Sequence, residues 1–351
     1  MTSSPALDGS SVTFELLDRY GRLAAVRLVQ EIGLPGPLDL VRRAGRWQLR
    51  IPVPDVDRME YLFEVEDHNG NRTTTTDPAN TRRAPGAFGD KSVVEFADYR
   101  PPAWLTAEPV PGTEVEVPVE APELDAILYA TVWTPSVLDD AEPAPLLVVH
   151  DGPEYATLGG LTRYLGVSIA TGALPPLRAA LLGPGDRNEW YSANPRYAQT
   201  MCAQVLDALG SVASATERIG VGVSLGALAM LHAHRTHPDM FDGLLLQSGS
   251  FFTPDLDAQE SGFSGFAAVT DFVAGVHAAT TDQNPVRTVL TCGTLEENLA
   301  NNVAMTASLQ RLGYRAELVR TRDTHNYTGW RDTLDPHLTG LIRHVVGARA
   351  S

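Results

Sequence analysis

The sequence has little basic charge, almost no lysine and almost no cysteine. Its 351 residues carry 27 lysines and arginines against 43 aspartates and glutamates, which gives a formal net charge of −16. This acidic balance argues against nucleic acids and anionic membrane surfaces as partners, because both require a basic face. The two cysteines, Cys202 and Cys292, belong to no Cys-x-x-Cys or Cys/His pattern, so we expect neither a disulfide scaffold nor a metal site.

Long apolar segments are also missing. No run of about 18 apolar residues occurs, and residues 1–10 lack the basic and then apolar layout of a signal peptide. We therefore expect a cytoplasmic protein with no membrane partner. Hydrophobic residues make up 43% of the chain and charged residues 20%, values typical of a globular protein with a full core. Nothing in the sequence indicates a cofactor.

The first part of the chain predicts a small β-sandwich. Short apolar or alternating runs are separated by turn signals such as Asn69-Gly70, and no helical period appears. Expected strands cover residues 12–17, 25–29, 47–51, 61–65 and 93–96. The pair Pro101-Pro102 marks a linker near residues 99–108. We thus expect a β-sandwich domain over residues 1–105 and a second domain over residues 106–351.

After the linker, strands and helices alternate, which predicts an α/β fold with a mainly parallel sheet and helices on both faces. Active sites in such sheets lie at the carboxyl ends of the strands. Expected strands cover residues 114–117, 126–133, 145–150, 178–182, 219–223, 243–247, 286–291 and 316–320. Expected helices cover residues 158–171, 197–209, 225–237, 298–312 and 331–346.

The strand–turn–helix around Gly222-Val-Ser224-Leu-Gly226 is the strongest motif. Gly-x-Ser-x-Gly in this context predicts a nucleophile elbow, in which a strained backbone exposes the serine hydroxyl. We expect the two glycines to be needed because a Cβ at either position would collide with the neighbouring strand or helix. An ordinary glycine-rich turn is the alternative.

A serine nucleophile needs a base, and the base needs an acid that holds its tautomer. In α/β-hydrolase order the acid comes next and the histidine last. Glu296 is the favoured acid and Glu297 is the reserve. The alternative role of Glu297 is that of a charge at the amino end of a helix, where the helix dipole favours it. His325 lies between a strand and the last helix and is the favoured base. The rival is His150, for which capping or lining the site is the better interpretation.

The oxyanion of the intermediate requires two preorganised donors. One is the backbone N–H of Leu225, which follows the nucleophile. The other should come from the loop after the strand that ends at His150, where Pro153 has no N–H. Gly152 is our choice for this donor, and Glu154 and Tyr155 remain open.

Several motifs occur in an order that resembles the enterochelin esterase family of ferric siderophore esterases, within the esterase-D-like α/β hydrolases. They are Asp151-Gly152-x-x-Tyr155, Arg187-Asn-Glu189-Trp190, the Ser224 elbow, Gly293-Thr-Leu-Glu296 and His325 with Trp330 beyond it. The resemblance implies a hydrolytic site of Ser224, Glu296 and His325. It also implies that Arg187 helps to hold an acidic siderophore, although Arg187 could instead form a structural ion pair with Glu189.

Aromatic residues leave two interpretations open. Tyr155, Trp190 and Trp330 either line an aromatic-acyl pocket or pack in the core. In the first domain, Trp47, Tyr61-x-Phe63-x-Val65 and Asp77-Pro-x-Asn80 resemble immunoglobulin-like domains placed ahead of glycogen- and starch-acting enzymes, and N-terminal domains of enterochelin esterases. For Trp47 and Tyr61 we favour core packing over a sugar-binding platform.

The expected function is that of a serine esterase with a small-molecule ester as its partner, and the resemblance implies a ferric siderophore whose iron arrives with the substrate. The sequence departs from the family pattern at Ala227, at Gln204 and at Arg322-Asp323-Thr324, where glycines are usual. Two alternatives therefore stay open. One is a carbohydrate-acyl esterase or an acyltransferase of secondary metabolism, and the other is a non-catalytic binding protein on a hydrolase scaffold.

Overall fold

The computed structural model describes residues 5–139 and 141–349, which form two compact units. The first unit comprises the described residues up to position 100 together with two short segments from late in the chain, 294–296 and 322–328. The second comprises the described residues of 101–293, 297–321 and the part of the chain after position 328. Each short segment follows a strand of the second unit, so the chain leaves that unit twice and returns.

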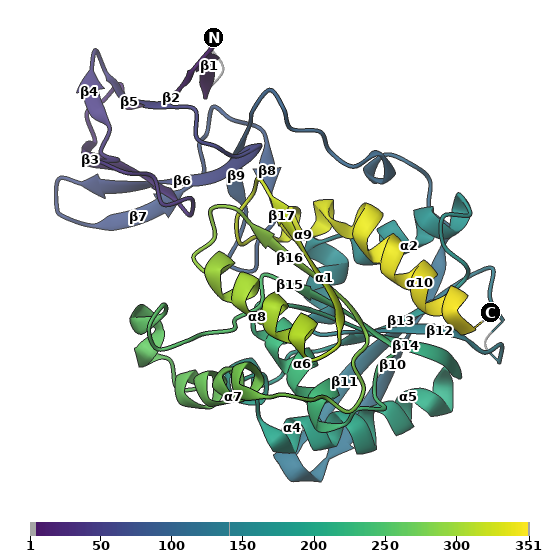
Figure 1. The fold of residues 1–351 in the computed structure, drawn as a ribbon. Coiled ribbons are helices and arrows are strands. Elements are labelled where there is room, and N and C mark those ends of the chain that lie inside the picture. Colours follow the sequence, from purple (N-terminus) through teal and green to yellow (C-terminus); the bar gives the residue numbers. More distant parts are fainter. Residues whose placement is uncertain (1–4, 140, 350–351) are drawn as a thin grey trace. The chain divides into compact units, whose positions relative to one another are not determined.

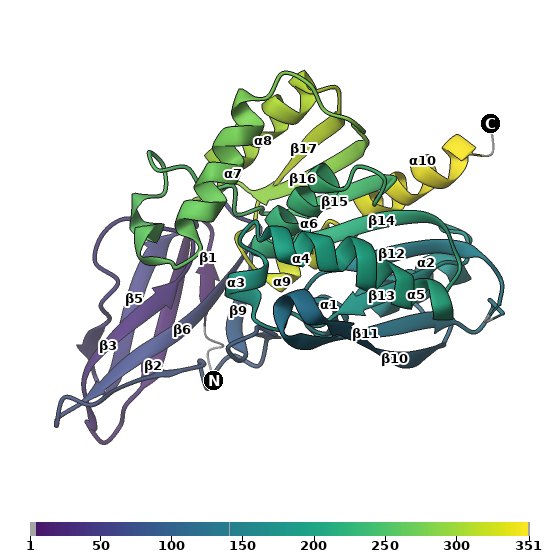
Figure 2. The same cartoon turned by 90° about the horizontal axis from the view of Figure 1, so that it is seen from below.

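The first unit contains two antiparallel sheets. One has the strand order β1-β2-β5-β4, and the other has the order β3-β6-β9-β8 with β7 also paired to β6 (Figure 2). The bounds are β1 Ala6–Asp8, β2 Ser11–Leu17, β3 Leu23–Gln30, β4 Val41–Arg43, β5 Arg46–Pro52, β6 Arg58–Asp67, β7 Arg72–Thr75, β8 Arg83–Ala84 and β9 Lys91–Glu95.

One hydrophobic core lies between these two sheets. Phe14 of β2, Leu28 of β3 and Phe63 of β6 are all buried in it, so each sheet turns its alternate apolar residues inward. Trp47 is 8% exposed and donates its indole N–H to Asp18 (3.2 Å). Tyr61 is 1% exposed and donates its hydroxyl to Asp77 (2.7 Å). Both aromatic residues therefore pack in the core, as the favoured interpretation had it.

The second unit is built on an eight-stranded sheet of order β10-β11-β13-β12-β14-β15-β16-β17 (Figure 1). The pairs β10–β11 and β11–β13 are antiparallel, and all later neighbours are parallel. The bounds are β10 Gly112–Ala121, β11 Ala126–Pro135, β12 Ala144–Val149, β13 Arg178–Leu182, β14 Ala215–Val223, β15 Gly243–Gln247, β16 Arg287–Gly293 and β17 Arg315–Thr321.

Helices cover both faces of this sheet, with α2 and α10 on one side and α4, α5 and α6 on the other (Figure 1). The α-helices are α1 Gly152–Leu158, α2 Leu161–Ala170, α3 Arg187–Trp190, α4 Pro195–Thr200, α5 Leu206–Val212, α6 Leu225–Thr236, α7 Phe266–Ala278, α8 Leu299–Arg311, α9 Tyr327–Asp332 and α10 Thr339–Arg349. Short 3-10 segments are η1 Ala103–Leu105, η2 Pro122–Leu124 and η4 Ala258–Gly262, and π-helical segments are η3 Met201–Val205 and η5 Leu334–Leu338.

Strand burial reflects this layering. Leu146 and Val148 of β12 lie in the core on the α6 side, whereas Leu147 and Val149 are equally buried but lie outside that cluster. Successive side chains of a strand point to opposite faces, so a strand covered on both sides is apolar throughout. The continuous apolar run at residues 145–150 is thus explained.

Three expected helices differ from the structure. The helix expected at 158–171 corresponds to α2, which begins only at Leu161 because Gly160 before it adopts φ +64°, and the separate helix α1 before it was not expected. The helix expected at 197–209 passes through the π-helical segment η3 between α4 and α5. The helix expected at 331–346 is interrupted at Asp335, which is extended (φ −107°, ψ 125°) because it precedes Pro336. Helix α7 was not expected.

No helix within residues 5–139 and 141–349 is long and apolar enough to cross a membrane.

Candidate active site

Ser224 stands at the sharp turn between β14 and α6. Its backbone has φ 57° and ψ −125°, a conformation that residues with a Cβ rarely adopt, as expected for an elbow. The turn is held by its neighbours, because Ser224 N–H donates to the carbonyl of Gln247 (2.9 Å) and the Ser224 carbonyl accepts from Ser250 N–H (3.2 Å). The serine side chain is partly exposed.

The glycines on either side of Ser224 are under different constraints. A Cβ on Gly222 would lie 2.3 Å from the carbonyl oxygen of Gly226, so only glycine lets α6 approach β14 this closely. A Cβ on Gly226 would lie 3.1 Å from Cβ of His150, which is a tight contact but not a collision with backbone. The expected steric conflict is therefore severe at Gly222 and mild at Gly226.

Ser250 is a residue of this turn that the sequence reasoning missed. Its hydroxyl oxygen lies 3.2 Å from the hydroxyl oxygen of Ser224, and the residue is 3% exposed. Ser250 follows β15, which is paired with β14. A polar residue just past the carboxyl end of the neighbouring strand was the signal available in the sequence.

Glu296 and His325 form a close pair within the first unit. Nδ1 of His325 lies 2.9 Å from Oε2 of Glu296. The Glu296 side chain is 1% exposed and that of His325 is 37% exposed, so the carboxylate is enclosed and the imidazole reaches solvent. With Nδ1–H donated to the carboxylate, the neutral imidazole carries its basic lone pair on Nε2. Glu297, the reserve acid, is exposed.

His150 is a buried structural residue. It is fully buried, Nδ1–H donates to the carbonyl of Gly226 (2.9 Å), and Nε2 accepts the hydroxyl of Tyr197 (2.9 Å). Burial lowers the pKa of His150 to about 4, with the Arg187 charge adding to the effect. With both ring nitrogens engaged, His150 fixes the loop after β12 to the first turn of α6 and cannot serve as the rival base.

Arg187 is paired with Asp151 rather than with Glu189. Its Nε and Nη2 donate to the two carboxylate oxygens of Asp151 at 2.8 and 2.9 Å, a bidentate pair. The alternative that paired Arg187 with Glu189 is corrected, because Glu189 instead accepts from Arg196 on the surface (2.9 Å). A Cβ on Gly226 would lie 3.2 Å from Oδ2 of Asp151, so this pair adjoins the first turn of α6.

The aromatic residues expected near the site are buried. Tyr155 is 0% exposed and donates its hydroxyl to Gln247. Trp190 is 7% exposed and stacks on Tyr197 with ring centroids 6.0 Å apart. Trp330 is 7% exposed and donates its indole N–H to the hydroxyl of Ser248 (2.8 Å). These contacts favour the packing alternative for all three residues.

The two expected oxyanion donors are the first residues of helices. Leu225 begins α6 and Gly152 begins α1, and the first N–H groups of a helix have no partner within it. Pro153 follows Gly152 within α1, so the loop beginning at Asp151 is already helical at this point. Their N–H groups are thus suited by position to meet a negative charge.

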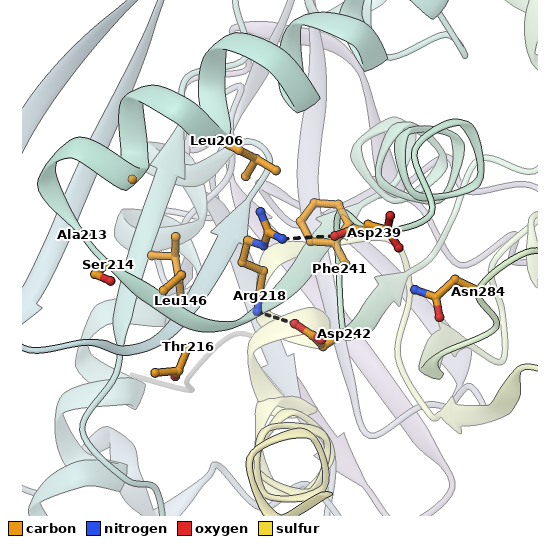
Figure 3. Close-up of a pocket in the computed structure, with 12 residues that line it drawn as sticks. Leu146, Leu206, Ala213, Ser214, Thr216, Arg218, Asp239, Phe241, Asp242 and Asn284 are labelled. Carbon is orange, nitrogen blue, oxygen red and sulfur yellow. Dashed lines mark hydrogen bonds between the residues drawn. The ribbon is translucent and has the colours of Figure 1, made fainter. Parts of the chain in front are cut away.

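A cavity of about 550 Å³ lies elsewhere in the second unit, and Figure 3 shows the residues that line it. Leu146 and Arg218 line it from the amino-terminal halves of β12 and β14, and Asp242 lines it from just before β15. Ser224 follows the carboxyl end of β14, so this cavity lies at the opposite end of the strand from the elbow. Among the residues that the structure describes, no cluster of three or more His, Cys, Asp or Glu could hold a metal ion.

Three features define an α/β hydrolase: the order of the strands in the sheet, the strained turn at Ser224 and the start of α6 directly after this turn. A family model described as "Putative esterase" matches residues 125–341, and the chain belongs to this esterase family. A search of curated proteins found no significant match.

Solved structures with similar folds include two enterobactin esterases. Ferric enterobactin esterase from Salmonella typhimurium has a TM-score of 0.80 at 19% identity, covering 98% of this chain and 96% of that one. Enterobactin esterase from Shigella flexneri, solved in the presence of enterobactin, has a TM-score of 0.78 at 21% identity, covering 97% and 95%. A ferulic acid esterase reaches 0.57 at 18% identity, covering 67% of this chain and 98% of that one. At these identities the likeness shows the fold, which is the fold that the enterochelin esterase resemblance predicted.

We expect His150 to make stability depend on pH. Its pKa of about 4 in the folded chain lies below the ordinary value of 6.5, so the unfolded chain binds the proton first as pH falls. The contribution is complete above about pH 6.5 and is lost as pH falls towards 4. Between pH 7.5 and 5.0 this amounts to about 2 kcal/mol of unfolding free energy.

Urea unfolding of the wild type and of His150→Asn at both pH values isolates this effect. The variant is expected to be less stable at pH 7.5, and its deficit should shrink by about 2 kcal/mol at pH 5.0. A deficit that is the same at both pH values would contradict a neutral, buried His150.

Proposed function

We propose that this chain is a serine carboxylic ester hydrolase in which Ser224, His325 and Glu296 form the catalytic triad. The observation that carries the proposal is the Glu296–His325 pair, in which a buried carboxylate binds Nδ1 and so orients the imidazole whose Nε2 would act as the base. The elbow supplies a strained, partly exposed serine hydroxyl. Buried carboxylate, oriented imidazole and serine are the three groups that nucleophilic acyl transfer requires.

Topology supports the same grouping. Ser224 follows β14, Glu296 follows β16 by three residues and His325 follows β17 by four. β14 to β17 are consecutive parallel neighbours, so their carboxyl ends share one edge of the sheet. The chain order of nucleophile, acid and base is that of α/β hydrolases.

The proposed mechanism follows from these roles. His325 Nε2 takes the proton of Ser224 as its hydroxyl oxygen attacks the ester carbonyl, and Glu296 stabilises the imidazolium. Backbone N–H groups of Leu225 and Gly152 meet the oxyanion. The imidazolium then protonates the leaving alcohol, and water, activated by the same histidine, releases the acid.

The proposed substrate is a siderophore-type ester such as a catecholate trilactone, with iron arriving as part of the substrate. The structural relatives are enterobactin esterases, and one was solved with 2,3-dihydroxy-N-benzoyl-serine. Arg187 supplies a partly exposed guanidinium (32%) beside the elbow for an acidic substrate. The immunoglobulin-like class of the first unit, its linker and the cytoplasmic location stay predictions from the sequence.

A carbohydrate-acyl esterase is the second candidate. The ferulic acid esterase fold favours it, and an acyltransferase would use the same residues. A chain of net charge −16 also repels highly anionic substrates at long range. Turnover of aryl esters, feruloyl sugars, and ferric and iron-free trilactones by the full-length protein distinguishes these candidates.

Ser224→Ala should abolish aryl-ester hydrolysis, reducing kcat by at least about a thousandfold, because no other group forms the acyl-enzyme. Circular dichroism should match the wild type, since alanine is smaller than serine. A serine-directed fluorophosphonate should label the wild type at Ser224, as identified by peptide mass spectrometry. Ser250→Ala is the matched control and should keep the label. Unlabelled wild type would instead support a binding protein on a hydrolase scaffold.

The identity of the catalytic acid can be tested by substituting two adjacent glutamates in turn. Glu296→Gln should lower kcat at least about a hundredfold, because the amide can no longer stabilise the imidazolium. Glu297→Gln, one residue away and exposed, should change kcat less than twofold. Steady-state kinetics with p-nitrophenyl acetate measures both. Equal losses in the two variants would remove Glu296 from the triad.

Arg187→Gln should raise KM for an anionic aryl ester about tenfold more than KM for p-nitrophenyl acetate, because one charge-assisted contact is lost. Since Asp151 would lose its partner, the double variant Asp151→Asn/Arg187→Gln serves as a second measurement. Arg196→Gln, from a surface pair, is the control. Equal changes in KM for both esters would show that Arg187 acts only through the fold.

A further inference from the structure

The first unit contains a buried arginine that binds the segment carrying His325. Arg58 begins β6 and is 2% exposed. Its Nη2 donates to Glu60 (2.6 Å), and its Nη1 donates to Asp323 (3.1 Å) and to Asn326 (2.9 Å). Asp323 and Asn326 are also buried. A single guanidinium thus holds residues on both sides of His325.

Asp323 and Asn326 also form hydrogen bonds within the segment around His325. Oδ1 of Asp323 accepts from the backbone N–H of Thr324 (2.8 Å) and from the side-chain amide of Asn326 (2.9 Å). That amide also donates to the hydroxyl of Thr324 (3.0 Å). Because Arg58 binds both ends of this network, its position sets the position of the turn that presents His325.

A second, exposed attachment lies at the start of the segment. The backbone N–H of Asp57 donates to the carbonyl of Arg322 (2.8 Å), and the Arg322 side chain donates to Asp57 (2.7 Å) and to Asp55. Arg322 is half-exposed, so these ion pairs are screened by solvent. We therefore expect the buried contacts of Arg58, and not these exposed ion pairs, to hold the segment around His325 in place.

The acid is attached to the same unit by an apolar contact. Leu295, the residue before Glu296, packs against the core between the two sheets of the first unit. The two segments that this unit takes from late in the chain are thus the ones that carry Glu296 and His325. Acid and base are held by one unit, and the serine belongs to the other.

The charge of Arg58 is stabilised by two carboxylates. Burial disfavours its charged form, but the carboxylates of Asp323 and Glu60 outweigh this and raise the pKa of Arg58, so the guanidinium stays charged. Lys91 lies 3.8 Å from Glu60 and closer to Glu31 (2.5 Å). A planar guanidinium can bridge three acceptors in fixed directions, which a lysine ammonium on a flexible stem cannot do.

We propose that Arg58 is a positioning residue for His325, so that the first unit sets the position of the proposed base. The proposal rests on the esterase function proposed above. Arg58 contacts no substrate; it fixes Asp323 and Asn326, and these fix the imidazole that Glu296 orients. The departure from glycine at Arg322-Asp323-Thr324 then has a function, because Asp323 supplies the acceptor that Arg58 needs.

The test compares Arg58→Lys with Arg72→Lys in the full-length protein. Arg72 lies on β7 in the same sheet and forms only an exposed pair with Glu66 (2.7 Å). For Arg58→Lys we expect kcat for p-nitrophenyl acetate to fall at least about tenfold with KM within twofold. Fluorophosphonate labelling of Ser224 should slow by a similar factor. Arg72→Lys should match the wild type in both measurements.

A spectroscopic measurement separates positioning from stability. The downfield proton resonance of His325 Nδ1–H, assigned by its loss in Glu296→Gln, should broaden or shift in Arg58→Lys and stay in place in Arg72→Lys. If Arg58→Lys does not fold, Asn326→Ala removes one acceptor of Arg58 without changing a charge and is expected to give the same pattern. A variant with a lower Tm but unchanged kcat and resonance would overturn the proposal.

The experiments distinguish failure of the proposed esterase function from failure of the positioning proposal. Wild type without Ser224-dependent turnover or labelling would refute the proposed function, and the positioning proposal falls with it. Wild type with normal turnover, together with full activity of folded Arg58→Lys and Asn326→Ala, would refute the positioning proposal alone.

Discussion

The close approach of helix α6 to strand β14 is the constraint on which the second unit depends. Only a glycine at position 222 leaves room for the carbonyl of Gly226, and this contact forces Ser224 into its strained backbone. Neighbouring residues also pack against this first turn of α6. His150 donates to the Gly226 carbonyl, and the Asp151–Arg187 pair lies beside it. Backbone strain persists where packing over-determines it, and this turn is packed from several sides.

The residues proposed as nucleophile, acid and base belong to different units of the chain. The eight-stranded sheet provides the serine, whereas the two-sheet unit holds Glu296 and His325 through Leu295 and Arg58. A small β-rich domain at the front of an enzyme is easily read as an accessory module. Here its buried arginine forms hydrogen bonds to, and its core packs against, segments from late in the chain, so the proposed base is attached to this unit.

Much of the site could be predicted from local sequence because its groups are tied to local structure. The elbow follows from glycine spacing between a β-branched run and a helix, and Glu296 and His325 follow from their places just after strands. The misses had physical causes. Pro336 imposes an extended residue before it and interrupts the expected last helix, and Gly160 separates α1 from α2. Glu189 is close to Arg187 in the sequence, but the partner of Arg187 is Asp151, and Glu189 pairs with Arg196.

The sequence by itself determined the class of protein, the strand and helix alternation, and the identity of the candidate nucleophile, acid and base, because each of these depends on periodicity or on short-range spacing. Only the tertiary structure decided which groups are buried together. It assigned His150 to a structural role, packed Tyr155, Trp190 and Trp330 away from solvent, and joined Arg58 to Asp323 across 265 positions of chain. Such pairings depend on which faces of the sheets pack together, and no local sequence pattern predicts them.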